Sequence, residues 1–564
     1  MHPDSTTATR RPTEAAFATG LTALRPGLAD AWAASLPGAR AAVLGRLWRA
    51  LLLEPLPGLT VEGPGRVRLD DGRPLTGPER LPHDLGLAQE ELVLRLDGRP
   101  FDHPAALLEA LGLPGSGPLR DELEDSVASL ALSRAGAPRA GGPDAAPTGR
   151  NGSTGSTSPT SPTGLTGFEQ GVVDGHPYHP CCRSRPGFSP AEQLAYGPEH
   201  RPVVALDLVA VPAAGALVSG DWPDRLRDGD RLLLPVHPWQ TRHVLPGLCV
   251  RPHTTAAIAA RPLMSVRTFA PLDGGPHLKT ALSMRMTSAV RDISAQSVAD
   301  SARLSELLDT LTRRLDGGAL RVTRNLAAAS AVLDGTASPD VAALVRESPE
   351  AFADPAAGET VLPVAALIGR PADGGQPLVR SLLSAAAPGQ DGAAWLTAFA
   401  RLALPPVLRL LSWGVALEAH GQNLLVVLDR RARPLRLVYR DLADVRISPA
   451  RLARNGFATP PLGRGLSDDP AVLHAKVYGS LVATTFGSLV SALGEADRPA
   501  EARLWAAVAA EAVRACDALP DTPDTRADRT ALFAAELPVK ALTLMRLQQA
   551  AHGDQWARLR NPLR

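Results

Sequence analysis

The 564-residue sequence contains little cysteine, few aromatic residues and almost no net charge. It has 4 cysteines, two of them adjacent at Cys181 and Cys182, which argues against a disulfide scaffold and is typical of a reducing cytoplasm. The 59 basic and 58 acidic side chains leave a formal charge of +1, so no overall field would attract nucleic acid or an anionic membrane. Any site for an anion must therefore be built locally.

Long uninterrupted apolar runs are also missing. The most apolar stretch, Ala398–Leu417, is broken by Arg401, Arg409 and a Pro-Pro pair, so it does not reach the ~18 apolar residues of a membrane span. The opening sequence, MHPDSTTATRRPTEAAF, has basic residues but no apolar core of signal-peptide length. We therefore expect a cytoplasmic protein that binds neither membrane nor nucleic acid, and the length predicts about two or three domains.

The first third of the sequence predicts a domain followed by a linker. Helical spacing over residues 14–53, short alternating runs over 59–96 and helical spacing again over 104–111 and 119–132 predict an α/β domain at 1–135. Residues 136–166 are built almost wholly from Gly, Ala, Pro, Ser and Thr. We expect a disordered linker or surface loop there, because such a segment buries too little apolar surface to fold.

The remaining sequence predicts two further domains and an α+β fold with antiparallel sheets. Residues 167–300 are rich in alternating, strand-like runs and should form a central β-rich domain. Residues 301–564 should form a largely helical C-terminal domain that contains one hairpin. Between residues 300 and 390 we expect helices, with a possible buried strand at 362–368.

The segment LMSVRTFAPLDGGPHLKTALSMRMTSAVRDIS, residues 263–294, is predicted to be a strand, a turn, a second strand and the start of a helix. Ser265 and Arg267 project from the same face of the first strand, because side chains alternate along a strand. In the second strand, apolar residues alternate with polar ones that include Lys279 and Thr287. One face is then cationic and hydroxylic, although a half-solvated sheet would show the same pattern.

Spacing limits which of these groups can act on one ligand. Lys279 and Thr287 are eight positions apart, so on a straight strand they would lie roughly 26 Å from each other. Thr287 and Arg291 are four apart, and with Thr287 or Ser288 capping a helix they would share a helical face that suits a carboxylate. Lys279 then suits a phosphate further along the cleft, while Arg267 and Arg291 offer planar forks.

Two His-Pro pairs occur in GHPYHPCCRSR, which starts at residue 175. The proline after each histidine favours an extended backbone, and the three-residue period of polyproline II places His176 and His179 on the same side, about 9 Å apart. This indicates a two-point clamp on an elongated anion. Two other interpretations stay open: a zinc site that adds Cys181 and Cys182, and a structural role in which the histidines fix a tight loop.

The third informative block follows a long apolar helix. It consists of the loop EAHGQN at 418–423, a predicted hairpin at 424–439 and then Asp441. A Glu or Asn of the loop together with this Asp is suited to a Mg²⁺ ion that bridges phosphate oxygens. The alternative is that His420 and Asn423 cap the end of the helix.

Seven short motifs of this sequence resemble, in matching order, those of the IucA/IucC family of NRPS-independent siderophore synthetases. The resemblance covers residues 168–547, and the motifs are GHPYHPCCRSRPGF, LLLPVHPWQ, SVRTFAP, HLKTALSMRMTSAVRDIS, EAHGQNLLVVLD, YRDL and PVKALTLMRL. It implies a multi-lobed, cupped-hand fold that holds nucleotide and acid between its lobes. It also implies a homodimeric enzyme that uses ATP and Mg²⁺ to adenylate a carboxylate of citrate or of a citrate or succinyl derivative. That carboxylate is then joined to a polyamine, an amino acid or an amino alcohol, with release of AMP and pyrophosphate.

The resemblance also implies roles for individual residues. The catalytic residues would be Lys279, Arg291 and His420. The contacts to the nucleotide would come from Ser265, Arg267, Thr268 and Lys279, with either His176 or His179. The carboxylate substrate would be bound by Thr287, Arg291 and His420, and Mg²⁺ by Glu418, Asn423 and Asp441. Arg183 departs from the family pattern, which usually has Lys there, so a contact specific to Lys is in doubt.

Two other functions fit some of the same residues. A kinase-like phosphotransferase would use the block at 418–441 for γ-phosphoryl transfer and would release ADP. A non-enzymatic binding protein for citrate or a ferric siderophore would use the same cationic cleft without ATP. The sequence has no Walker A, GxGxxG or GxSxG motif, so the usual signatures of other nucleotide or acyl-transfer sites are missing.

Overall fold

The computed structural model describes residues 11–85, 91–137, 164–287, 289–371, 374–386, 391–548 and 553–564. Most of the predicted linker at 136–166 lies outside these ranges. Its last three residues are not a linker but the start of helix α5 (Gly164–Gln170). Leu165 explains this difference, because it is buried in a cluster with strand residues of the C-terminal part.

The N-terminal part packs helices against a small antiparallel sheet, as its apolar spacing predicts. Helix α2 (Pro26–Leu53) packs against α4 (Gly117–Gly136), and Trp32 on α2 donates its indole N–H to the carbonyl of Ala128 on α4. Helices α1 (Pro12–Leu24) and α3 (Pro104–Leu111) pack on this pair. The strands pair in sequence order and are β1 (Leu59–Gly63), β2 (Arg66–Leu69), β3 (Pro74–Thr76), β4 (Leu94–Leu96) and β5 (Arg99–Phe101).

A nine-stranded antiparallel sheet forms the centre of the molecule, in the order β7-β16-β17-β12-β11-β10-β6-β9-β8. Its strands are β6 (Val204–Pro212), β7 (Ala216–Gly220), β8 (Arg227–Asp228), β9 (Arg231–Val236), β10 (Thr254–Pro262), β11 (Thr268–Pro271), β12 (His277–Thr280), β16 (Asn325–Leu333) and β17 (Thr336–Arg346). Lys279 on β12 lies opposite Thr268 of β11 and Leu344 of β17. This register places Lys279 in the interior of the sheet.

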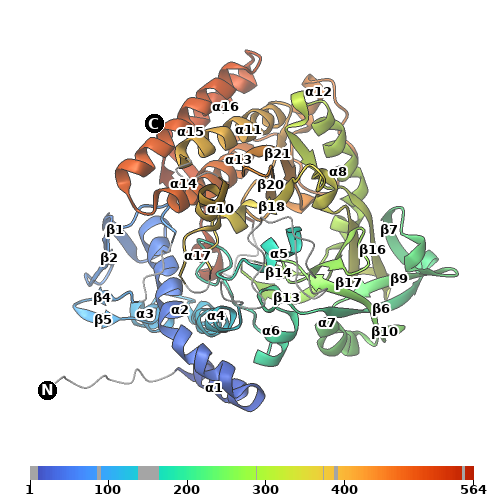
Figure 1. Cartoon of the computed structure of the whole chain (residues 1–564), viewed down its shortest axis with the longest axis horizontal. Helices are drawn as coiled ribbons and strands as arrows, with labels where there is room; N and C mark the ends of the chain where they lie inside the picture. The colour runs from blue at the N-terminus through green and yellow to red at the C-terminus, as the bar shows by residue number, and fades with distance from the viewer. Residues whose placement is uncertain are drawn as a thin grey trace.

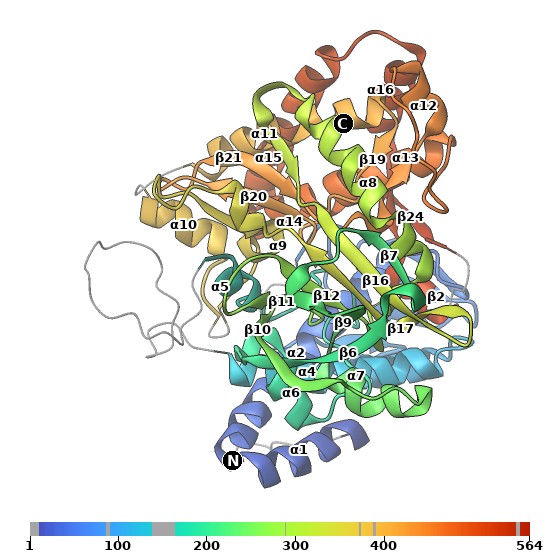
Figure 2. The ribbon, with the colours of Figure 1, turned by 90° about the vertical axis from the view of Figure 1, so that its right-hand side faces the viewer.

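Strands β16 and β17 correct the predicted division at residue 300. The sequence predicts helices here, but the two strands pair with each other and with β7 and β12, so the central sheet continues to Arg346 (Figure 2). Their alanine-rich sequence favours helix by intrinsic propensity, and pairing on both sides overrides it. The small side chains let helix α8 (Ala295–Arg313) pack against β16.

The start of the 263–294 segment is a turn and not a strand. Val266 has a φ of 67°, in the left-handed region, and strand β11 begins only at Thr268. Ser265 and Arg267 therefore do not alternate along a strand. The predicted pairing of their side chains on one strand face is wrong.

The end of the same segment is a hairpin and not a helix start. Strand β13 (Leu282–Met286) pairs with β14 (Ala289–Arg291), and Thr287 lies at the tip of this hairpin with a φ of 55°. Ser288, the other predicted cap, lies outside the described residues. Helix α8 begins at Ala295, where the side chain of Ser294 accepts the N–H of Ser297. The predicted helix cap at Thr287 is therefore wrong.

The C-terminal part is largely helical around a four-stranded sheet of order β15-β21-β20-β18. The predicted hairpin is confirmed as β20 (Leu424–Leu428) and β21 (Pro434–Tyr439), and β21 also pairs in parallel with β15 (Leu320–Val322). The possible strand at 362–368 is shorter than expected, since β18 (Thr360–Pro363) runs into helix α9 (Val364–Leu367). The larger helices are α10 (Leu378–Ala386), α11 (Gly392–Ser412), α13 (Pro470–Val477), α14 (Gly487–Gly494), α15 (Arg498–Asp517) and α16 (Pro523–Leu532).

Two apolar helices form much of the C-terminal core. Helix α11 and the continuous helix Pro470–Gly494 are long and apolar enough, by length and composition, to cross a membrane, and both lie mostly inside the structure. Figure 1 shows the N-terminal helices at the lower left, the central sheet at the right and the C-terminal helices at the top. The mixed helical and antiparallel architecture confirms the predicted α+β class.

Candidate active site

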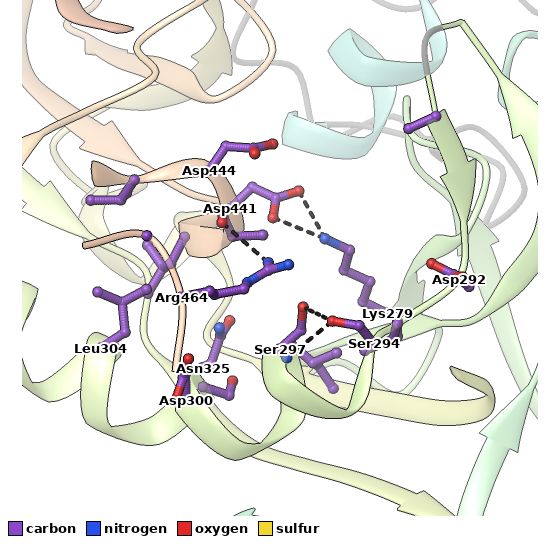
Figure 3. Close-up of a pocket in the computed structure, with 18 of the residues that line it drawn as sticks. Lys279, Asp292, Ser294, Ser297, Asp300, Leu304, Asn325, Asp441, Asp444 and Arg464 are labelled. Atoms are coloured by element: carbon purple, nitrogen blue, oxygen red, sulfur yellow. Dashed lines mark hydrogen bonds and ion pairs between the residues drawn. The ribbon is translucent and has the colours of Figure 1, made fainter. Parts of the chain in front are cut away.

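Two cavities lie where the central sheet meets the C-terminal part, and four charged residues line both of them. These residues are Arg267, Lys279, Arg291 and Asp441, and we refer to them as the shared wall. The first cavity, named the histidine cavity, has a volume of about 170 Å³ and is also lined by His176 and His420. The second, named the acidic cavity, has a volume of about 240 Å³ and is also lined by Asp292, Asp300 and Asp444 (Figure 3).

Lys279 and Asp441 form an ion pair at the shared wall. Nζ of Lys279 donates to both carboxylate oxygens of Asp441, at 2.9 and 2.8 Å, and Arg346 lies 3.6 Å from one of them. Burial alone would raise the pKa of Asp441. The nearby cations Lys279 and Arg346 lower it by more than burial raises it, so the net pKa lies well below its usual range. Burial also lowers the pKa of Lys279, which Asp441 opposes. Asp441 therefore stays anionic and holds the ammonium group at the wall.

Arg267 and Arg291 are held at the same wall by oxygen acceptors. Arg267 donates to the backbone carbonyls of Arg291 and Asp292, the latter at 2.7 Å. Arg291 donates to the carbonyl of Met286 at 2.8 Å and to Oγ1 of Thr287 at 2.5 Å. Burial and the nearby Arg291 lower the pKa of Arg267 to about 10, so it remains a cation at neutral pH. Thr287 and Arg291 thus come together as predicted, although on a hairpin.

Ser265 and Thr268 close the turn before β11. Oγ of Ser265 donates to Oγ1 of Thr268 at 2.8 Å and accepts the backbone N–H of Thr268 at 3.2 Å. Among the described residues of the histidine cavity, Ser265 is part of the lining and Thr268 is not. Ser265 therefore lies at the surface of the histidine cavity, and Thr268 is bonded to it from outside the lining.

The rings of His176 and His179 pack edge to face, with their centroids 6.1 Å apart. Nδ1 of His176 accepts the N–H groups of Tyr178 and His179, and Nδ1 of His179 accepts the N–H of Cys181. Burial lowers the pKa of both rings, that of His179 to about 3. Of the described lining residues of the histidine cavity, His176 is one and His179 is not. These local bonds favour the loop-fixing interpretation over a shared zinc ion. His176 is the one of the two rings that lines the cavity.

Glu418 is the centre of a buried ion network. Its Oε1 lies 3.2 Å from Nζ of Lys476 and 2.5 Å from Nζ of Lys540, and both lysines also contact Asp554. Burial alone would raise the pKa of Glu418. Lys540 and Lys476 lower it by more than burial raises it, and the net pKa is about 2. Nε2 of His420 lies 4.0 Å from the other carboxylate oxygen of Glu418, and burial lowers the pKa of His420. The network thus anchors the loop that carries a neutral His420.

The three residues predicted to bind Mg²⁺ do not form a ready set of ligands. Carboxylate and amide oxygens are the ligands that Mg²⁺ prefers. Here the carboxylate of Asp441 is bonded to Lys279, that of Glu418 to two lysines, and the amide of Asn423 donates to the carbonyl of Glu418 at 3.3 Å. Glu418 lines a third, smaller cavity, whereas Asp441 lines the two larger ones. The Mg²⁺ assignment therefore stays a prediction, and no step below depends on it.

Several charged residues around the site were not singled out from the sequence. Lys476 on α13 and Asp554 belong to no motif, and Arg346 ends a strand that was predicted as helix. Lys540 stands in PVKALTLMRL and Arg440, which forms a buried ion pair, stands in YRDL. Because Lys540 and Arg440 stand in two of the seven ordered motifs, the motifs could have pointed to both residues.

Comparison with protein families identifies the segment that carries most of this wall. Residues 164–369 match the model of the IucA / IucC family. Over residues 164–369 the chain is therefore similar to the IucA/IucC family. A second model, described as ferric iron reductase FhuF-like transporter, matches residues 393–555.

Bacterial relatives are between 22% and 28% identical to this chain over the residues that align. Staphyloferrin A synthase of Staphylococcus aureus is 23% identical over 428 residues, which are 70% of this chain and 72% of that protein. D-ornithine--citrate ligase of the same species is 22% identical over 466 residues, 70% of this chain and 69% of that protein. Rhizobactin siderophore biosynthesis protein RhbC of Rhizobium meliloti is 28% identical over 396 residues, 61% of this chain and 66% of that protein.

Solved structures share the fold over almost the whole chain. Petrobactin biosynthesis protein AsbB from Bacillus anthracis has a TM-score of 0.76 at 19% identity and covers 98% of both chains. ATP-bound aerobactin synthetase IucA from Klebsiella pneumoniae has a TM-score of 0.71 at 21% identity and covers 93% of this chain and 99% of that one. These likenesses confirm the multi-lobed α+β architecture.

Proposed function

We propose that this chain is an ATP-dependent ligase that adenylates a carboxylate and condenses it with an amine or alcohol. The shared wall is the observation that carries the proposal. Arg267, Lys279 and Arg291 line two adjoining cavities, so the same cations serve a nucleotide and an acid on one side and face a nucleophile on the other. One relative named as a citrate ligase and one named as a citryl-hydroxylysine synthase support citrate or a citrate derivative as the acid. A succinyl derivative rests on the resemblance to the family. The ATP-bound neighbour supports ATP as the cosubstrate.

The first step joins two anions, so it needs local positive charge. A carboxylate oxygen attacks the α-phosphorus of ATP, the bond from that phosphorus to the pyrophosphate oxygen breaks, and pyrophosphate leaves. We assign the phosphate contacts to His176, Ser265, Arg267 and Lys279, with Thr268 supporting Ser265. We assign the carboxylate to Thr287, Arg291 and His420. Because burial lowers the pKa of His420, it would act there as a neutral hydrogen-bonding partner.

The second step releases AMP. The nitrogen of a free amine attacks the carbonyl carbon of the acyl adenylate, a carbon–nitrogen bond forms, and the bond from that carbon to the phosphate oxygen breaks. The electron pair leaves with AMP, and the amine proton passes to solvent. A homodimer, a cytoplasmic location and Mg²⁺ bound with ATP belong to the same proposal and rest on the resemblance to the family.

The test supplies ATP, Mg²⁺ and hydroxylamine, with citrate, succinate and 2-oxoglutarate in separate reactions. Acid-dependent pyrophosphate and a hydroxamate are expected with citrate or a close analogue. ADP in place of pyrophosphate would establish the kinase-like alternative. Binding of citrate with no consumption of nucleotide, under conditions where the protein is folded, would establish the binding-protein alternative.

A further inference from the structure

Two walls of the histidine cavity come from distant parts of the chain. Residues 264–267 form one, the turn before β11, and residues 420–422 form the other, the loop before β20. We refer to them as the turn wall and the loop wall. In the proposed ligase, Ser265 and Arg267 on the turn wall contact the phosphates, and His420 on the loop wall contacts the acid. The separation of the two walls therefore sets how the carboxylate meets the α-phosphorus.

Helix α5 holds the turn wall from behind through its last two residues. Glu169 accepts the backbone N–H of Met264 at 3.0 Å, and Gln170 donates its amide N–H to the carbonyl of Pro262 at 3.0 Å. Helix α5 itself packs on β18 of the C-terminal sheet, and its Leu165 is buried against that sheet (Figure 1). The loop wall leads directly into β20 of the same sheet. The turn wall is thus held by a helix that packs on the sheet of the opposite wall.

Arg440, which follows β21, holds the loop wall from behind. Its Nε donates to the carbonyl of Gln422 at 3.1 Å, and its backbone N–H donates to the carbonyl of Asn423 at 3.0 Å. Its Nη1 donates to the carboxylate of Glu169 at 2.5 Å. The side chains of Glu169 and Arg440 are 1% and 7% exposed, and neither is among the described residues that line the histidine cavity or the acidic cavity. One buried ion pair therefore connects backbone groups of both walls from outside the cavities.

Both ends of this ion pair are fully engaged. One oxygen of Glu169 accepts the N–H of Met264 and the other accepts the guanidinium, while Arg440 uses separate nitrogens for Glu169 and Gln422. Hydrogen bonds between charged groups are short and directional, and a buried carboxylate that lost its guanidinium would be left without a partner of opposite charge. The pair therefore resists any change in the separation of the two walls.

We propose that Glu169 and Arg440 are positioning residues for adenylation, which hold the turn wall and the loop wall at one separation. This inference rests on the proposed ligase function. Neither side chain lines the cavity, so neither touches ATP or the acid. Their role is to keep the bound carboxylate in line with the α-phosphorus, where a misplacement of about 1 Å can lower the rate about 100-fold. Loss of the pair should therefore slow the chemical step more than it weakens the binding of ATP.

The kinetic test uses Glu169→Gln and Arg440→Lys. Glutamine keeps an oxygen for the N–H of Met264 and loses the charge that faces Arg440. Lysine keeps the buried charge and loses the forked geometry that reaches both Glu169 and Gln422. We expect kcat for acid-dependent pyrophosphate release to fall about 100-fold in Glu169→Gln and about tenfold in Arg440→Lys. The dissociation constant of ATP, measured without acid, should stay within about threefold of wild type. A purely structural role would lower the melting temperature and leave kcat per folded molecule unchanged.

The matched control is Glu359→Gln, which breaks another ion pair made by strand β21. Glu359 pairs with Arg436 at 2.8 and 3.0 Å, and neither is among the described residues that line the two cavities. This variant should keep the wild-type kcat. If Glu169→Gln does not fold, Arg440→Lys decides alone, because it keeps the buried charge. A kcat within about threefold of wild type in the folded variants would overturn the inference, and so would a loss of ATP affinity as large as the loss of kcat.

Hydrogen exchange of the full chain without ligands separates failure of this inference from failure of the ligase proposal. Arg440→Lys removes a bond to the loop wall only, and Glu169 can still accept the N–H of Met264. Exchange in residues 262–268 should nevertheless become at least about threefold faster, together with exchange in residues 418–424, and the control should show neither change. Such coupled exchange in a protein that forms no pyrophosphate with any acid would reject the ligase proposal alone. Pyrophosphate formation by the wild type, with exchange of residues 262–268 unchanged in Arg440→Lys, would reject this inference alone.

Discussion

The ammonium group of Lys279 lies 2.8 Å from the carboxylate of Asp441, a residue 162 positions later in the chain. This ion pair joins β12, in the interior of the nine-stranded sheet, to the end of β21 in the C-terminal sheet. Both residues line both cavities. The charge at the proposed reaction centre is therefore set by how these two sheets pack against each other.

Substitution of Lys279 tests the cationic wall directly. Lys279→Met removes the buried ammonium group, and we expect acid-dependent pyrophosphate release to fall about 100-fold or more, which corresponds to ~2.7 kcal/mol of transition-state stabilisation. Arg285→Met is the matched control, because Arg285 is exposed on β13, and it should keep wild-type turnover. Circular dichroism of both variants checks the fold. Turnover within threefold of wild type in Lys279→Met would remove this residue from the site.

Arg291 and Arg267 should affect different kinetic constants. Arg291→Ala removes the group assigned to the carboxylate substrate, so the KM for the acid should rise at least about tenfold while the KM for ATP changes little. Arg267→Ala should lower kcat/KM for ATP and abolish most turnover with the fold intact. Arg313→Ala, exposed on α8, is the control. An unchanged KM for the acid in Arg291→Ala would contradict the assignment.

Substitution of Glu418 tests whether this residue binds Mg²⁺ or only holds a structural ion network together. Glu418→Gln leaves the buried Lys476 with Asp554 as its remaining partner, so we expect the free energy of unfolding to fall by about 3 kcal/mol. The Mg²⁺ concentration that gives half-maximal activity should stay at its wild-type value. Glu495→Gln, which removes a half-exposed partner of two arginines, should cost less than about 1 kcal/mol. A large rise in the Mg²⁺ requirement of Glu418→Gln would instead identify Glu418 as a ligand.

Features that depend on neighbouring residues could be predicted from the sequence. The predicted strand at 424–428 is confirmed as β20, because Leu and Val fill five consecutive buried positions between polar loops. Helix α3 at 104–111 was also predicted, and it has proline at its first position and glycine at its end, as helix termini favour. The four residues of the shared wall were all named from their motifs.

Features that depend on distant partners could not be predicted. The alanine-rich strands β16 and β17 are strands because their neighbours β7 and β12 complete their hydrogen bonds, and periodicity does not encode those neighbours. Lys476 lies 58 positions from Glu418 and 78 from Asp554, so spacing gives no sign of their network. The contact between Thr287 and Arg291 was predicted correctly, but the predicted helix was wrong. A tight hairpin and a helical turn both bring residues four apart into contact.

Glu54 gives the protein a pH-dependent stability that is separate from the site. Its carboxylate follows α2 and accepts the N–H groups of Thr543 and Leu544, each at 2.8 Å, at the start of helix α17 (Leu542–Leu547). Burial raises its pKa from 4.5 to about 7, although these bonds and Arg49 oppose the rise. Folding then takes up a proton between about pH 4.5 and 7, so this contribution to stability is lost as the pH rises through that window.

Glu54→Gln removes this titration and keeps a carbonyl oxygen for the bonds to helix α17. Relative to wild type, the variant should therefore gain stability as the pH is raised from 5 to 8, by up to about 3 kcal/mol. Urea unfolding at pH 5, 6, 7 and 8 measures the difference. Glu79→Gln, at an exposed position, should follow the wild-type pH dependence. Parallel curves for Glu54→Gln and wild type would show that Glu54 remains ionised in the folded protein, and the two backbone N–H groups would then outweigh its burial.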